Sequence, residues 1–193
     1  MKKHSIQIVI YNARIIGILF LLAFLAYGFG RHLFFESGTV SEKYAGSILI
    51  IINSTIVLFI GILLKKTLQQ YNLLIGNIYL LTRIFEAIAL AIVFLNLIPQ
   101  FNIPLGYEYF LAMFVLGLGS IPMCWVLFKH RITPKWLAIW GAIGYTVFAF
   151  GFLMEFFGKH WSMYLLAIGG LWEITFAIWL IINGRFNGKT INR

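Results

Sequence analysis

The sequence contains no aspartate, and all six of its acidic residues are glutamates. This absence excludes aspartyl intramembrane proteases and hydrolases that depend on a His-Asp pair. A single cysteine, Cys124, excludes an intramolecular disulfide and a metal site built from several thiolates of one chain. Charge is scarce as well, since 11% of the 193 residues are charged, against about a quarter in soluble domains.

Histidine is confined to the tails and to the ends of the apolar segments. Its four positions are His4, His32, His130 and His160. No histidine can therefore form a dyad with the mid-segment Ser120 or ligate a haem within the apolar runs. No lysine lies mid-segment, which excludes a retinal Schiff base, and no glycine-rich phosphate loop is present. His32, Glu36, Glu155 and His160 could meet on one surface, but their spacing has no metal signature. We expect neither metal nor cofactor.

Apolar residues make up most of what is present. The chain is 61% hydrophobic and 18% aromatic, with a mean hydropathy of +0.91. Nearly all of it falls into apolar runs of roughly twenty residues, the length of helix that crosses a bilayer. The sequence therefore predicts an all-α, polytopic membrane bundle, a single transmembrane domain over residues 1–193. Its six predicted spans are 14–33, 47–65, 73–98, 107–128, 134–157 and 161–183.

The cations fall mostly on one side of these six spans, in tails and short connections. That side carries Lys2, Lys3, Arg14, Lys65, Lys66, Lys129, Arg131, Lys135, Arg185, Lys189 and Arg193, whereas Arg31, Lys43 and Lys159 fall on the other. The positive-inside rule predicts that the first side, with both termini, is cytoplasmic. The net charge of +9 is thus an orientation signal in a multi-pass protein of the cell membrane, with lipids and not nucleic acid as its surroundings.

Three ionisable residues remain inside the spans: Arg83 and Glu86 in the third and Glu173 in the sixth. Insertion scales assign about 2.5 to 3.5 kcal/mol to a charge at a helix centre, so all three are expected to face the bundle interior. Arg83 and Glu86, three residues apart, share a helix face. We predict an Arg83–Glu173 contact at a seam where small residues such as Gly169 and Ala177 let the two helices pack closely.

This trio forms a candidate polar site near the bilayer midplane. One cation and two carboxylates leave one excess negative charge, so we expect one glutamate to be protonated at neutral pH. Four further polar residues are expected to line the site: Tyr79, Asn53, Ser120 and Tyr145. The trio could instead be a structural ion pair that only fixes helix packing.

The segments that begin at Glu86 and Glu173 are similar, which suggests a repeat. If the first two spans are moved along the chain by the separation between Glu86 and Glu173, they fall on the fourth and fifth spans. Because each half would contain three spans, the halves would be inverted relative to each other, as in many secondary transporters. A 3+3 inverted repeat is therefore one interpretation of the chain, and chance similarity is the other.

Several short segments have a distinctive pattern: Ala13-Arg14-Ile15-Ile16-Gly17, Arg83-Ile84-Phe85-Glu86-Ala87, Leu127-Phe128-Lys129 leading to Ile132-Thr133-Pro134-Lys135-Trp136, and Trp172-Glu173. These segments resemble the bacterial membrane proteins of the domain-of-unknown-function 4386 (DUF4386) family. The Arg-x-x-Glu-Ala segment is the most specific. The resemblance implies a compact multi-span protein and draws attention to Arg83, Glu86 and Glu173, but the family has no assigned activity.

Three functions are compatible with the sequence. The first is binding or transport of a small molecule or lipid at Arg83, Glu86 and Glu173. The second is a non-catalytic membrane scaffold or regulator held together by the same charges. The third is an intramembrane enzyme that modifies a lipid, with Glu86 or Glu173 as general acid or base. The midplane charges and the candidate repeat favour the first.

Overall fold

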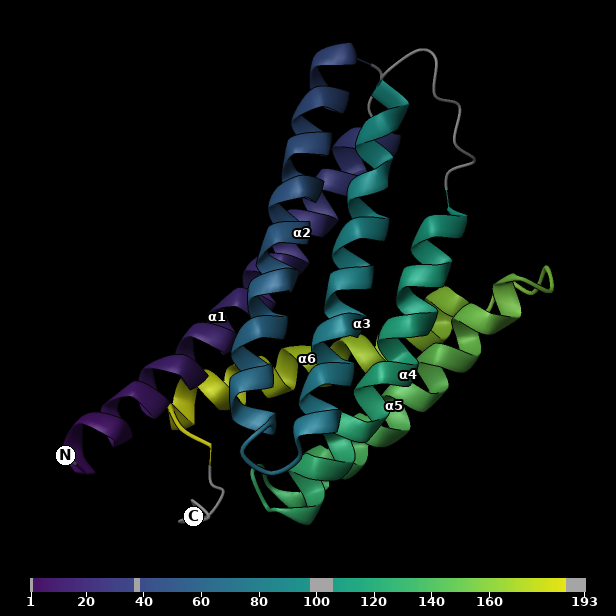
Figure 1. Ribbon diagram of the computed structural model, residues 1–193. Coiled ribbons are helices and arrows are strands. Elements are labelled where there is room, and N and C mark those ends of the chain that lie inside the picture. Colours follow the sequence, from purple (N-terminus) through teal and green to yellow (C-terminus); the bar gives the residue numbers. More distant parts are fainter. Residues whose placement is uncertain (1, 37–38, 98–105, 187–193) are drawn as a thin grey trace.

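The computed structural model describes residues 2–36, 39–97 and 106–186, and these are almost entirely helical (Figure 1). The helices are α1 (Lys2–Phe35), α2 (Val40–Leu68), α3 (Leu73–Ala91), a 3₁₀ helix η1 (Ile92–Leu97), α4 (Tyr107–Lys129), α5 (Lys135–Glu155) and α6 (Ser162–Asn183). Six helical segments are long and apolar enough to cross a membrane, one in each of α1 to α6. The predicted six-span, all-α architecture is confirmed, and the chain is a multi-pass membrane protein.

Helix boundaries differ from the prediction where local hydrogen bonds extend or tighten a helix. α2 begins at Val40 rather than 47, because Thr39 and Glu42 form a capping box: the Thr39 hydroxyl accepts from the Glu42 amide, and the Glu42 carboxylate accepts from the Thr39 amide. The Thr-x-x-Glu pattern of this capping box, Thr39 followed by Glu42, is present in the sequence. α3 leaves the α-helical form after Ala91 and continues as η1, a common ending for a helix.

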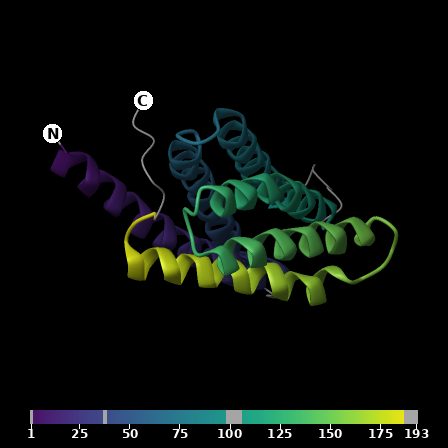
Figure 2. The same cartoon turned by 90° about the horizontal axis from the view of Figure 1, so that it is seen from below.

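The six helices form a closed ring in chain order. Each packs against its sequence neighbours, and α1 packs against α6 to close the ring. Figure 1 shows α2 and α3 running side by side, with α5 and α6 inclined behind them, and Figure 2 gives the view along the bundle from below. The described start of α1 and end of α6 lie at the same end (Figure 1), which we call the termini end. The other end, where α1 ends and where α2 and α4 begin, is the distal end.

The predicted close packing of the third span against the sixth is wrong. α3 packs between α2 and α4, whereas α6 packs between α5 and α1. The small residues of α6 serve these other neighbours, because Gly169 lies against Gly144 and Phe148 of α5, and the carbonyl of Ala177 lies against Gly17 of α1. Among the described residues, the long side chains of Arg83 and Glu173 join α3 and α6 across the interior.

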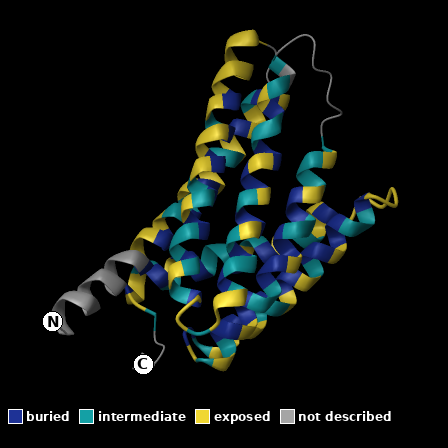
Figure 3. Cartoon of the chain, viewed as in Figure 1, coloured by how far each residue is buried: buried dark blue, intermediate teal, exposed yellow. Residues whose placement is uncertain are grey.

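Buried side chains gather inside the ring, and exposed apolar ones cover its outside (Figure 3). Trp172 shows how one interior contact is made. Its ring occupies the space beside Gly141, where a β-carbon would lie 2.5 Å from Cε2, and its Nε1 donates to the Leu137 carbonyl at 2.6 Å. α5 and α6 are thus joined next to Glu173 by a contact that only glycine permits.

Candidate functional site

Arg83 of α3 lies at the centre of the ring with 2% of its surface exposed. All three of its nitrogen atoms donate: Nε to the Tyr79 hydroxyl at 2.8 Å, Nη1 to Glu86 Oε2 at 2.8 Å and Nη2 to Glu173 Oε1 at 3.5 Å. Tyr79 and Glu86 come from the same face of α3, as the spacing predicts. The predicted contact between Arg83 and Glu173 is confirmed, although it is the longest of the three.

Glu173 is held from a second direction by α5. The Tyr145 hydroxyl donates to Glu173 Oε1 at 2.6 Å, so this oxygen accepts from both Tyr145 and Arg83. Tyr145 packs edge-on against Trp172, with ring centroids 5.1 Å apart. A hydrogen-bonded chain therefore runs from α3 through Arg83 and Glu173 to α5, across the middle of the ring.

Two residues that the sequence reasoning missed complete the surroundings of Arg83. Gly61 of α2 makes room for it, because a β-carbon there would lie 2.7 Å from the Arg83 Cβ. The Phe20 ring of α1 lies 5.4 Å from the guanidinium carbon, a cation–π distance. Neither residue is polar, so no chemical signal in the sequence distinguished them from ordinary packing residues.

A cavity of about 230 Å³ adjoins this cluster on the distal side. Arg83, Glu86 and Asn53 contribute its polar groups at the cluster, and Tyr27, Arg31 and Tyr109 contribute them further out. The remaining lining is apolar and comes from Phe20, Ala23, Phe24, Gly28, Val57, Ile60, Leu90, Met113, Met163 and Leu166. Such a mixture, mostly apolar with a few convergent polar groups, is typical of small-molecule sites.

A second hollow of about 370 Å³ continues the cavity to the distal end and shares Tyr27, Arg31, Leu90 and Tyr109 with it. Tyr27 stacks on Tyr109, with ring centroids 5.4 Å apart. The Arg31 guanidinium carbon lies 5.5 Å from the centroid of Tyr109. Glu108 also lines this hollow, so the mouth carries one charge of each sign. Tyr27 and Arg31 are about one helical turn apart in the sequence, a spacing that indicates a shared face of α1.

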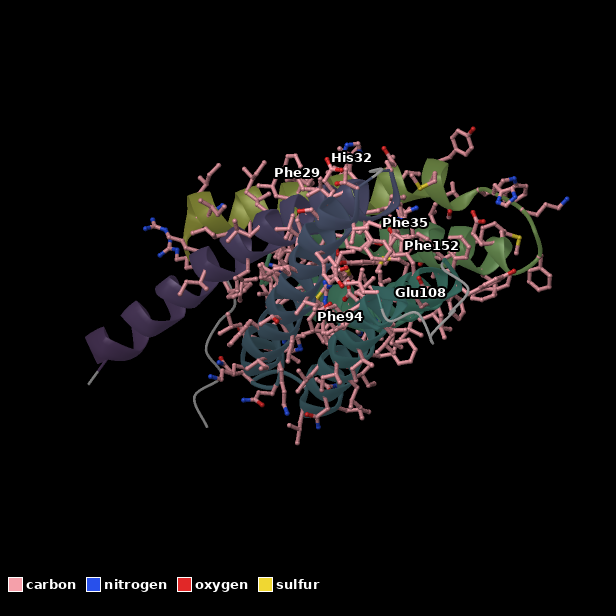
Figure 4. The ribbon with its side chains drawn as sticks, turned by 90° about the horizontal axis from the view of Figure 1, so that it is seen from above. Phe29, His32, Phe35, Phe94, Glu108 and Phe152 are labelled. Carbon is pink, nitrogen blue, oxygen red and sulfur yellow. The ribbon has the colours of Figure 1, made fainter. Side chains whose placement is uncertain are left out.

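The cavity also adjoins a groove on the outer surface of α1. Phe24 and Gly28 line both the cavity and a shallow groove of about 300 Å³ that is completed by Leu25, Phe29 and His32. Gly28 has open space around its α-carbon. Figure 4, seen from above, shows Phe29 and His32 on the outer side of α1 and Glu108 near the start of α4. The groove on the outer side of α1 and the hollow at the distal end therefore both adjoin the same cavity.

The structure unites most of the predicted site residues but not all of them. Tyr79 and Tyr145 bond directly to the charged trio, and Asn53 lines the cavity with 3% of its surface exposed. The Asn53 carboxamide makes no hydrogen bond within the described part of the chain. Ser120 is fully buried in α4, its Oγ has no partner among the described residues, and it does not line this cavity.

The surface histidines and glutamates form two separate pairs instead of one cluster. His32 bonds Glu36 at 2.7 Å at the end of α1, and His160 bonds Glu155 at 3.0 Å beside the start of α6. Glu155 also accepts from the Ser162 amide at 3.1 Å, so it satisfies a backbone donor at the start of α6. Within residues 2–36, 39–97 and 106–186, no group of three metal-ligating side chains occurs.

Comparison with known proteins identifies one family. The model described as "Domain of unknown function (DUF4386)" matches residues 104–184. This match supports membership of the chain in the DUF4386 family. The match covers α4 to α6, so it includes Tyr145 and Glu173 of the charged cluster but not Arg83 or Glu86. No curated protein and no solved structure matches the chain.

Proposed function

We propose that this DUF4386 protein binds a membrane-soluble small molecule or lipid in the cavity beside Arg83 and Glu86. The observation that carries the proposal is the position of a buried, charged cluster beside an apolar, aromatic cavity. Ionisable groups within a membrane span are costly and mark functional sites by default. The ligand's polar group would lie at Glu86 and Asn53, and its apolar part between Phe20 and Phe24 of α1 and Met113 of α4.

The orientation and location of the protein belong to the same proposal. Basic residues at the termini end, among them Lys65, Lys66, Lys129 and Lys135, support a cytoplasmic location of that end in a bacterial inner membrane. The cavity would then open toward the outer leaflet and the outer surface. Transport would further require an opening toward the termini end, which the inverted-repeat interpretation would supply.

Two variants with the same chemical change test the binding proposal. Ala23 lines the cavity, so Ala23→Phe should fill part of it, whereas Ala167 is exposed on α6 and Ala167→Phe should leave it open. The probe is N-phenyl-1-naphthylamine, a small neutral aromatic molecule. Native mass spectrometry of protein released from detergent should detect one bound probe on the parent and on Ala167→Phe. Ala23→Phe should bind much less.

Equal unfolding temperatures of the two variants would show that the fold is retained. Absence of bound probe on the parent, or unchanged binding by Ala23→Phe, would contradict the proposal.

Catalysis on a lipid has weaker support, because Glu86 is the one carboxylate among the described residues that line the cavity. The scaffold hypothesis rests on the hydrogen bonds of Arg83 alone and leaves the cavity without a role.

A further inference from the structure

The charges of the central cluster do not balance. Arg83 contributes one positive charge, and Glu86 and Glu173 contribute two negative charges when both are ionised. Arg83 and Glu86 are almost completely buried, and Glu173 has a side-chain exposure of 14%. Because an uncompensated charge in a low-dielectric interior is unfavourable, the excess negative charge requires one counter-charge, which is either a proton or a bound cation.

The hydrogen bonds indicate where that counter-charge would lie. Arg83 already donates from all three nitrogen atoms, and Glu173 Oε1 already accepts from Arg83 and Tyr145. Glu86 accepts from Arg83 through Oε2, while its Oε1 accepts no hydrogen bond from the residues that the structure describes. Glu86 also lines the cavity. Glu173 Oε2 likewise accepts no hydrogen bond from the described residues, but Glu173 does not line the cavity, so Glu86 is the incompletely bonded carboxylate beside the open space.

The walls of the cavity suit an organic cation. Phe20, Phe24, Tyr27 and Tyr109 supply aromatic rings, whose faces attract cations. The aliphatic lining from α2, α4 and α6 favours a ligand with a substantial apolar surface. At the mouth, Arg31 is matched by Glu108, so the entrance has no net charge that would exclude a cation.

Resting on the proposed function, we infer that the ligand is a lipophilic monovalent cation that exchanges with one proton at the Arg83–Glu86–Glu173 cluster. When the cation enters, the O–H bond of one protonated carboxyl breaks, and the proton leaves to water through the cavity mouth. The cation then supplies the counter-charge that the proton had supplied. Other titratable groups that interact with the two glutamates are Tyr79 of α3, Tyr109 and Cys124 of α4, and Tyr145 of α5. Tyr27 and Arg31 of α1 line the same cavity.

Two probes of nearly the same shape and opposite charge provide the test. Tetraphenylphosphonium is the cation and tetraphenylborate is the anion, and binding to the full-length protein in detergent is measured by isothermal titration calorimetry. The cation should bind at least about tenfold more tightly than the anion. Repeating the titration in buffers of different ionisation enthalpy should reveal up to one proton released per cation. With one-for-one exchange, the cation's affinity should rise up to about tenfold per pH unit.

Charge-changing variants make the test specific. Glu86→Gln or Glu173→Gln alone leaves a neutral cluster, so each should weaken cation binding by about tenfold or more and abolish proton release. The double variant carries one excess positive charge and should prefer tetraphenylborate. Glu36→Gln, at an exposed pair at the end of α1, should behave like the parent, and the unfolding temperature of each variant would verify its fold.

Equal affinity for the two probes, or cation binding without pH dependence and proton release, would overturn this inference. If N-phenyl-1-naphthylamine still bound to the parent and bound much less to Ala23→Phe, the proposed binding function would survive and only the cation assignment would fail. If neither the neutral probe nor the cation bound, both would fail.

Discussion

Replacing Arg83 by methionine tests whether the cluster is a buried, mutually dependent unit. The substitution retains an unbranched side chain but removes the charge and the three donors, which reach Tyr79, Glu86 and Glu173 at 2.8, 2.8 and 3.5 Å. Removing one partner of a buried pair costs about 3 to 5 kcal/mol, because the other charge is left uncompensated. The lost cation–π contact with Phe20 at 5.4 Å adds about 0.5 to 2 kcal/mol.

We therefore expect Arg83→Met to lower the free energy of unfolding by about 3 to 5 kcal/mol, measured by SDS titration in mixed micelles at neutral pH. Adding Glu86→Gln and Glu173→Gln should restore most of this loss, because neutral amides no longer need a buried counter-charge. The matched control is Arg185→Met, which removes a cation beyond the end of α6 and should change stability by under about 0.5 kcal/mol. A loss below about 1 kcal/mol for Arg83→Met, or no recovery in the triple variant, would refute the reasoning.

Two further variants examine the cluster and the cavity separately. Tyr145→Phe removes the donor to Glu173 and should destabilise the protein by about 1 to 3 kcal/mol in the same SDS titration. The control Tyr164→Phe, at a residue 80% exposed, should not change the stability. Equal effects of the two variants would argue against the buried hydrogen bond. Asn53→Cys, made in a background without the natural cysteine, should react with N-ethylmaleimide through the cavity, and Ser54→Cys, equally buried but outside the cavity lining, should not. Mass spectrometry measures both reactions, and similar labelling of the two would mean that the cavity does not control access.

Local pattern was enough to predict the helices, because the physics that determines a membrane span acts within the segment. Each span must satisfy its own backbone hydrogen bonds and cover about 30 Å of hydrocarbon with apolar side chains. The early start of α2 was also encoded locally, in the Thr39–Glu42 capping box. The same reasoning brought Arg83, Glu86 and Glu173 together, since charges inside spans have few partners other than one another.

Helix order around the ring was not available from the sequence. Small residues on α6 indicated close packing but did not identify the partner, because Gly169 suits any helix that can approach it; in the fold that helix is α5. Ser120 appeared equivalent to Asn53 as a polar residue inside a span, yet only Asn53 faces the cavity. The contributions of Gly61 and Phe20 to the site depend on which helices neighbour α3.

The sequence by itself thus determined that the chain crosses a membrane six times and that three charges must be buried together. These conclusions follow from composition and from the free-energy cost of charge in hydrocarbon, both of which are local quantities. The tertiary structure decided that Arg83 reaches Glu173 across a ring interior and that a cavity opens beside Glu86. A cavity is space left between several helices, so it depends on how all of them pack and is encoded in no single segment.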